Sequence, residues 1–348
     1  MHIPDNYLSP QTDAVLAAVM VPVWVRCARV VRERLDRRHL SFLGMAAAFS
    51  FLLMMFNVPL PGGTTGHAVG GTLVALLLGP EAACLAVSVA LAIQALVFGD
   101  GGLLAFGANC LNMAFVLPFV GWGVARLVRG GSTSPARRRV AAAVGAYVGL
   151  AVAALCAAVE FGIQPMLFSD AAGNALFCPY GLDVAVPAMM VPHLLVACVV
   201  EAVSTVAIYE FVLRCAPDLV VGEDAARPAA PASGSRGLAR VAMLVGALAV
   251  ATPLGLLATG DAWGEWSTED LVANAGLAKA PAGMASGLSF ESVMPDYSLA
   301  GLPDAAAYVL SALIGVALLV IIFKLVAQTA HAAPAEKCAG TDAPGGRA

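Results

Sequence analysis

Long apolar runs separated by short polar segments dominate this chain. A transmembrane helix needs about 20 apolar residues to cross roughly 30 Å of hydrocarbon. Residues 66–98 would span about 50 Å as one helix at about 1.5 Å per residue, so this run divides at Gly79-Pro80. The pattern therefore predicts nine crossings, of which the third is short: 12–31, 41–60, 67–79, 81–98, 104–128, 140–162, 184–213, 238–257 and 306–324.

Composition supports this all-α polytopic membrane fold. Hydrophobic residues make up 60% of the chain, charged residues only 12%, and the mean hydropathy is +0.84. A soluble domain of 348 residues does not have that balance, so the protein is predicted to be integral to a membrane. The 8 cysteines are scattered and form no Cys-x-x-Cys pair, which argues against a disulfide framework.

The basic residues predict the orientation of the nine spans. All 19 lysines and arginines except Lys279 fall on one side of the predicted membrane, in the segments after spans one, five, seven and nine. Lysine and arginine are enriched on the cytoplasmic side of membrane proteins. The C-terminus is therefore predicted to be cytoplasmic, and the N-terminus, after an odd number of crossings, to lie outside.

A change in composition at residues 215–237 predicts two membrane units. This stretch is rich in Ala, Pro, Gly and Ser and is expected to be a flexible cytoplasmic linker. It separates a seven-span domain, 1–214, from a two-span module, 238–325. The remaining residues, 326–348, are rich in Ala, Pro and Gly and are expected to be a disordered cytoplasmic tail.

The outer loop of the two-span module, 258–305, is strongly acidic. Its aspartates and glutamates face a single basic residue, Lys279. Such a loop raises the local concentration of cations. An ordinary solvated loop is an equally good interpretation.

The first two residues, Met1 and His2, form a potential metal chelate. A polar segment follows them, and not the basic region and apolar run of a signal peptide. Removal of the initiating methionine requires a small second residue, so Met1 is expected to keep its amine. That amine, the His2 amide nitrogen and the His2 imidazole can close a five-membered and a six-membered ring around one metal ion. Taken alone, the dipeptide is also consistent with an arbitrary second residue.

His67 offers a fourth nitrogen on the same predicted side of the membrane. It ends the Pro/Gly-rich segment 59–67, in which glycines permit close backbone approach and prolines stiffen the entry. The short helix that follows indicates that this loop dips below the membrane surface. A hydrogen-bonded core histidine is the alternative. Four nitrogens that include an amide favour Ni²⁺, Cu²⁺ or Co²⁺ over Zn²⁺, and reject Mg²⁺ and Ca²⁺.

Four further polar residues lie close to these motifs and are candidates for supporting the ligands. Asp5 and Asp100 are carboxylates that could replace the nitrogen donors, and the glycines around Asp100 could form a turn that closes over the site. Asn109 and Asn112 lie in an apolar helix, where unpaired polar groups are costly. They could hydrogen-bond either the N-terminal segment or neighbouring helices.

His193 and Glu201 lie eight residues apart in the seventh span, roughly on one face of a helix. Glu201 could bind a proton or a metal, but an interhelical anchor is the favoured interpretation because no second carboxylate lies near it in sequence. The sequence has no Walker A loop and no His-Glu-x-x-His motif, so it is not expected to hydrolyse nucleotides or to be a metalloprotease.

Together these motifs resemble the substrate-binding membrane subunits of energy-coupling factor (ECF) transporters for cobalt and nickel, the CbiM/NikM group. The matching segments cover most of the seven-span domain: Met1-His2-Ile3-Pro4-Asp5, Pro61-Gly62-Gly63-Thr64-Thr65-Gly66-His67, Phe98-Gly99-Asp100-Gly101-Gly102-Leu103, Ala108-Asn109-Cys110-Leu111-Asn112-Met113 and His193-Leu194-Leu195. Residues 238–325 resemble the two-span NikN or PDGLE-type partner, fused to the main subunit. Two segments depart from the family pattern: Asn6 replaces a usual glycine, and Pro295-Asp296-Tyr297-Ser298-Leu299 stands where Pro-Asp-Gly-Leu-Glu is the full match.

The resemblance implies a seven-helix ECF substrate-binding body whose additional N-terminal helix carries the N-terminus into a central pocket. It implies that Met1 and His2, through amine, amide and imidazole, and His67 hold a transported Ni²⁺ or Co²⁺, with no other cofactor. It also implies a multi-pass protein of the plasma membrane that works with a transmembrane coupling subunit and separate cytoplasmic ABC-type ATPases. The fused module is then expected to help load the metal.

Two other functions compete with metal uptake. A membrane enzyme could use the metal to activate water, but a saturated planar site leaves no open position for catalysis. A metal-sensing membrane scaffold would bind the ion without moving it into the cell.

Overall fold

The computed structural model describes residues 1–61, 64–221, 234–258 and 260–330. The one hairpin in these residues consists of β1 (Val58–Leu60) and β2 (Thr64–Gly66), which pair antiparallel. The α-helices are α1 (Pro10–Arg34), α2 (Arg37–Met55), α3 (Gly71–Leu78), α4 (Pro80–Ile93), α5 (Phe106–Asn109), α6 (Leu117–Arg129), α7 (Pro135–Gly162), α8 (Gln164–Leu167), α9 (Leu182–Pro192), α10 (Cys198–Cys215), α11 (Gly234–Ala251), α12 (Thr268–Ala275), α13 (Ala282–Ala285) and α14 (Asp304–Ala330). Three π-helical segments, η1 (Gln94–Phe98), η2 (Cys110–Val116) and η3 (His193–Ala197), and three 3-10 turns, η4 (Pro217–Leu219), η5 (Thr252–Leu257) and η6 (Pro295–Tyr297), complete the order.

Eight helices in the described part of the chain are long and apolar enough to cross a membrane. Five of them are composite: α5, η2 and α6 form one continuous helix, α9, η3 and α10 form another, and α4, α7 and α11 continue into η1, α8 and η5, respectively. This confirms a multi-pass, mostly helical membrane protein.

The expected third span differs from the prediction, because α3 has only eight residues. Leu77 near its end accepts a hydrogen bond from the Val221 amide (2.8 Å), so α3 ends beside the segment that follows α10. The described residues between α2 and α3, 56–61 and 64–70, cover the rest of the distance without helical structure. A non-helical backbone at membrane depth is tolerated when it is buried in protein, and residues 65–75 are buried throughout.

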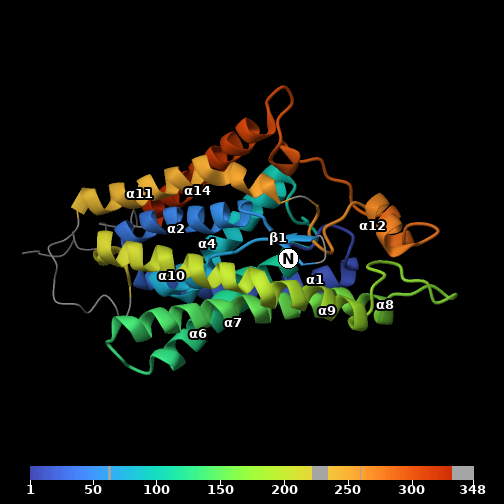
Figure 1. Cartoon of the computed structure of the whole chain (residues 1–348), viewed down its shortest axis with the longest axis horizontal. Coiled ribbons are helices and arrows are strands. Elements are labelled where there is room, and N and C mark those ends of the chain that lie inside the picture. Colours follow the sequence, from blue (N-terminus) through green and yellow to red (C-terminus); the bar gives the residue numbers. More distant parts are fainter. Residues whose placement is uncertain (62–63, 222–233, 259, 331–348) are drawn as a thin grey trace, which may run out of the picture.

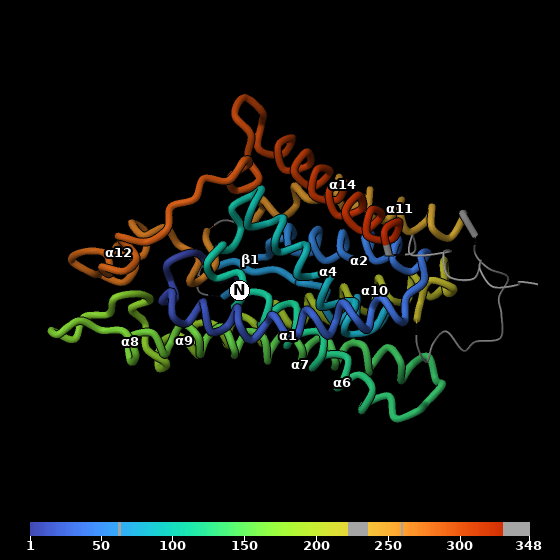
Figure 2. Tube along the Cα trace, turned by 180° about the vertical axis from the view of Figure 1, so that it is seen from behind, coloured from blue at the N-terminus to red at the C-terminus, as the bar shows by residue number. Residues whose placement is uncertain are grey.

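The basic segments gather at one end of the molecule. Figures 1 and 2 show the turn between α6 and α7 and the linker-side ends of α10 and α11 at that end, with α8 and α12 at the opposite end. Because the chain also passes from one end of the molecule to the other through the hairpin and α3, successive connecting segments still lie at alternate ends. The helix arrangement is therefore compatible with the orientation predicted from the basic residues.

Small residues allow the helices of the body to pack closely around α7, which contacts α6, α9 and α10. At Gly149 a Cβ atom would lie 2.7 Å from the Leu117 carbonyl oxygen and 3.0 Å from Thr72 Oγ1. Any larger residue would push α7 away from α3 and α6. Close packing of this kind stabilises membrane helices, since lipid provides little hydrophobic driving force between them.

The two-span module packs on the body through α14 and α2. Gly44 on α2 allows this approach, because a Cβ atom there would lie 3.0 Å from Phe323 Cβ and 3.2 Å from Val320 Cα. The loop between α11 and α14 contains α12, α13 and η6, and it extends over the end of the molecule where the N-terminal segment lies (Figure 1). There the Tyr7 hydroxyl donates a hydrogen bond to the Trp266 carbonyl (2.8 Å).

The predicted linker and tail are shorter in the structure than in the sequence analysis. Leu219 and Val220 are buried, so the first residues of the predicted linker belong to the packed body. Helix α11 already begins at Gly234, and α14 continues to Ala330. The rest of the linker, 222–233, and of the tail, 331–348, lies outside the described residues.

Candidate metal centre

The N-terminal segment lies inside the protein, and both views show the N-terminus among the helices (Figures 1 and 2). Met1, His2 and Ile3 have exposed fractions of only 3%, 2% and 0%. Asn109 fixes this segment, because its Oδ1 accepts from the Ile3 amide (2.8 Å) and its Nδ2 donates to the Ile3 carbonyl (3.0 Å). These bonds satisfy the buried backbone of Ile3 and hold the preceding dipeptide in place.

The turn at Asp5 and Asn6 ties the segment to its surroundings. Asp5 Oδ1 accepts a hydrogen bond from the Leu104 amide (2.7 Å). Asn6 takes a φ of 70°, a left-handed conformation that Asn tolerates better than most residues. Its side-chain amide exchanges two hydrogen bonds with the backbone of Leu288 in the module, each 2.9 Å long. Asn6 therefore maintains the turn that a glycine would form, and adds a contact between the two units.

His67 meets His2 at the centre of the body. The Nε2 atom of His67 lies 3.2 Å from Nδ1 of His2, and the ring centroids are 5.0 Å apart. The Nδ1 atom of His67 lies 3.1 Å from the Ala68 carbonyl oxygen. A proton on this Nδ1 donates to the carbonyl and leaves the Nε2 lone pair for a metal ion, as in many metal-binding histidines.

Glu201 holds the loop that carries His67. Its carboxylate, on the buried side of α10, accepts hydrogen bonds from the amides of Val69 (2.7 Å) and Gly70 (2.9 Å). Gly70 has a φ of 74°, and these two amides directly precede α3. Glu201 therefore joins α10 to the His67 loop, as an interhelical anchor does.

Two carboxylates lie against the N-terminal dipeptide. Glu265 Oε1 is 2.5 Å from the Met1 amine, and Asp100 Oδ1 is 3.2 Å from His2 Nδ1. One ligand atom from each of His2, Asp100 and Glu265 lies within 4.8 Å of the others. In the sequence, Glu265 is one of several acidic residues of the loop 258–305, and nothing in its local sequence distinguishes it from the others.

Burial and charge determine the protonation of these groups, which lie outside the membrane-spanning helices. Burial lowers the pKa of His2 and of His67 to about 4, so both imidazoles are neutral near pH 7. Burial by itself would raise the pKa of Glu265, but the positively charged Met1 amine beside it brings that pKa below its usual value. Neutral imidazoles beside an ionised carboxylate are suited to a cation.

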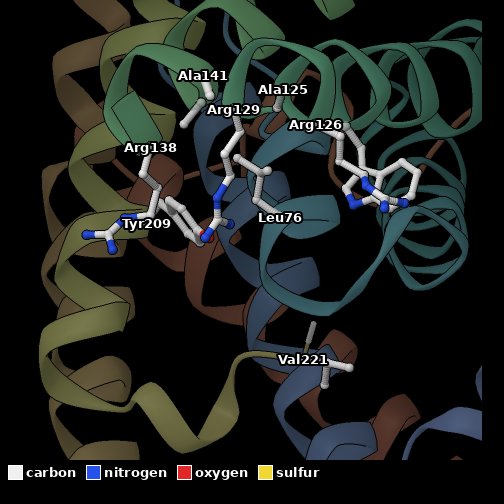
Figure 3. Close-up of a pocket in the computed structure, with 10 residues that line it drawn as sticks. Leu76, Ala125, Arg126, Arg129, Arg138, Ala141, Tyr209 and Val221 are labelled. Carbon is white, nitrogen blue, oxygen red and sulfur yellow. The ribbon is translucent and has the colours of Figure 1, made fainter. Parts of the chain in front are cut away.

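A cavity of about 330 Å³ opens beside the dipeptide and is lined by His2, His67, Asp100 and Glu265, among others. A second cavity, of about 260 Å³, is lined by Arg126, Arg129 and Arg138 (Figure 3). Its cationic lining repels a metal ion. The first cavity therefore has the chemistry of a cation site.

The remaining predicted residues, His193 and Asn112, form hydrogen bonds with groups other than the dipeptide. His193 lines a small cavity next to Met1, and its Nδ1 lies 2.7 Å from the Met189 carbonyl oxygen. Asn112 donates to Glu160 on α7 (2.7 Å). Asn112 thus contacts a neighbouring helix, whereas Asn109 contacts the N-terminal segment.

Each π-helical segment lies next to a residue of this region. Gln94 begins η1 and donates to Asp100 Oδ2 (3.0 Å), η2 follows Asn109 directly, and His193 begins η3. Such wide turns within α-helices are frequent at functional sites. They redirect side chains that a regular α-helix would place elsewhere.

The comparison with protein families decides the identity of the body. Residues 2–219 match the model for the cobalt uptake substrate-specific transmembrane region, CbiM. The chain belongs to the CbiM family. Residues 238–331 match the PDGLE domain, so this CbiM-family protein carries its PDGLE module in the same chain.

Full-length relatives share this fused organisation. The chain is 47% identical over 330 residues to the probable fused nickel transport protein LarMN of Lactiplantibacillus plantarum, covering 93% of this chain and 97% of the relative. It is 48% identical to the fused nickel transport protein NikMN of Rhodobacter capsulatus, covering 92% and 95%. The crystal structure of a truncated transition metal transporter is 51% identical, with a TM-score of 0.58, and covers 62% of this chain and 99% of that one. The chain therefore belongs to a family of membrane proteins for cobalt and nickel transport.

Substitution of Glu201 by Gln tests its role as an anchor. The Gln oxygen can replace Oε2, which accepts from both amides, but the Gln NH₂ group then replaces Oε1, which lies 3.1 Å from the Gly70 nitrogen, and the charge that strengthens these bonds is lost. The expected loss is about 1–3 kcal/mol in the free energy of unfolding, measured as a lower thermal midpoint, with metal stoichiometry retained. Glu269→Gln, on the exposed side of α12, is the control and should change neither quantity. Normal stability with loss of metal would instead make Glu201 a ligand.

Proposed function

We propose that this protein is the metal-binding membrane subunit of an ATP-driven ECF-type importer for Ni²⁺ or Co²⁺. The observation that carries the proposal is that His2 and His67 line one cavity together with Glu265, whose carboxylate pairs with the buried Met1 amine. The two imidazole nitrogens, His2 Nδ1 and His67 Nε2, are 3.2 Å apart. Adjacent ligands at right angles, each about 2.0 Å from a metal, are separated by roughly 2.8 Å, so a small adjustment lets both bind one ion.

The Met1 amine and the His2 amide would supply the other two donors. Together with His2 Nδ1 they form two fused chelate rings, which leave one planar position for His67. A strong-field set of four nitrogens favours Ni²⁺ and Co²⁺ over the oxygen-seeking Mg²⁺ and Ca²⁺.

The carboxylates would serve two purposes in this scheme. Glu265 pairs with the Met1 ammonium before metal arrives, and the pair must separate when the amine loses its proton and binds the ion. Together with Asp100 it then offsets the charge of the ion in a pocket where electrostatic interactions are strong. The module would in this way take part in loading the metal.

Energy for transport would come from partners. The chain contains no Walker A motif, so cytoplasmic ABC-type ATPase subunits and a transmembrane coupling subunit are needed to drive the ion inward. The same partners follow from the family resemblance.

An N-terminal extension tests the amine ligand. A peptide fused before Met1 converts the amine into an amide and cannot fit in the buried pocket. Nickel binding, measured by isothermal titration, should fall by at least about 100-fold. The same peptide fused after Ala348 is the matched control and should have no effect. Equal affinity of the two fusions would show that the amine is not a ligand.

The pH dependence of binding tests the protonation states. Metal must displace one proton from the Met1 ammonium and one from the His2 amide, but none from imidazoles whose pKa is about 4. Nickel affinity should therefore rise with pH by roughly 100-fold per unit between pH 5 and 7. Titrations in buffers of different ionisation enthalpy count the protons released. A steeper dependence of nickel affinity on pH below pH 6.5 would mean that the histidines bind protons there. A count near zero for the protons released per ion would mean that carboxylates hold the metal.

Accumulation of radioactive nickel in cells tests transport. Cells with this chain, a coupling subunit and ATPase subunits should accumulate nickel, and the His67→Ala variant with the same partners should not. An ATPase subunit with an inactivated Walker A motif should also abolish accumulation. Uptake that persists with this subunit would overturn ATP-driven coupling.

A further inference from the structure

Tyr297 has a backbone conformation that favours glycine. Its φ is 58° and that of the preceding Asp296 is 51°. A side chain in this left-handed region is strained, and such strain persists where the surrounding structure fixes the residue, often at functional sites. The conformation also explains why glycine suits this position of the Pro-Asp-Gly-Leu-Glu motif. The question is what a tyrosine contributes here.

The Tyr297 side chain points into the metal-binding body. Its hydroxyl donates to Asp100 Oδ2 and accepts from Gln94 Nε2 (2.9 Å). Its ring stacks on Phe98, with centroids 4.8 Å apart. Tyr297 is only 7% exposed, so these contacts exclude water from one side of the Asp100 carboxylate.

The contacts select one orientation of Asp100. Gln94 also donates to Asp100 Oδ2 (3.0 Å), so two donors occupy this oxygen. The other oxygen, Oδ1, is left facing His2 Nδ1 at 3.2 Å. Of these two donors, Gln94 belongs to the body and Tyr297 to the module.

The backbone around Tyr297 is anchored on both units. Ser311 on α14 donates to the Tyr297 carbonyl (2.9 Å), and the Met294 amide donates to the Val97 carbonyl in η1 (2.8 Å). The position of the tyrosine hydroxyl therefore depends on the docked module, as well as on the local turn.

We propose that Tyr297 is a positioning residue through which the docked module fixes the Asp100 carboxylate beside the metal ligands. The inference rests on the proposed function and adds a determinant of affinity to it. A divalent ion with one deprotonated amide leaves a net positive charge in the pocket. A carboxylate held at a short distance offsets that charge better than one free to turn toward water.

The test measures nickel affinity by isothermal titration of the full chain and three single variants. Tyr297→Phe keeps the stacked ring and removes the hydroxyl, and should weaken binding about tenfold. Tyr297→Gly relieves the backbone strain but also removes the buried ring, so it should weaken binding at least as much as Tyr297→Phe and, unlike that variant, lower the thermal midpoint. Tyr147→Phe is the matched control: its hydroxyl donates to the Leu194 carbonyl (2.9 Å), and its loss should leave nickel affinity unchanged.

A double-mutant cycle with Asp100→Asn separates positioning from a structural effect. If Tyr297 acts through Asp100, Tyr297→Phe should change affinity less than twofold in the Asp100→Asn background. The positioning role would be overturned if the double variant lost affinity by the product of the two single losses, or if Tyr297→Phe bound nickel as tightly as the unsubstituted chain. Neither result would overturn the proposed function. Failure of the unsubstituted chain to bind nickel would overturn the proposed function, and the positioning role with it.

Discussion

The ion pair between the Met1 amine and Glu265 is the interaction on which the site depends. A charged group is costly to remove from water unless it is paired, and Met1 is only 3% exposed. Glu265 supplies the partner at 2.5 Å, while Asn109 satisfies the backbone of Ile3 behind it. These contacts allow a chain terminus, normally exposed and mobile, to occupy a defined position within the protein.

The module is consequently part of the site as well as an attached unit. Glu265 and Tyr297 reach the N-terminal dipeptide and Asp100, and Leu288 holds Asn6. Asn6 and Tyr297, the two residues that stand where the family pattern has glycine, have positive φ values and contact the other unit. Side-chain contacts at these positions offset a strain that glycine would avoid, which explains how the chain departs from the pattern without losing the turns.

Polar residues inside the helical body support the ligands without being placed among them. Glu201 binds the two amides that follow the His67 loop, and Gln94 binds Asp100. Each is buried and would be unfavourable in an apolar environment without its partner. The site is thus built from loops and irregular helix segments, and the long helices position them.

The sequence by itself determined the membrane character, the long spans, the family and the residues His2 and His67 as candidates. These features depend on hydropathy over about 20 residues or on short contiguous motifs, which survive without knowledge of the fold. Tertiary structure alone decided that the third pass is largely non-helical, because burial by neighbouring helices makes that possible. It also decided which of many acidic residues meets the N-terminus: Glu265 lies 264 positions from Met1. Only the packing of α14 on α2 and the path of the module loop bring these two residues together.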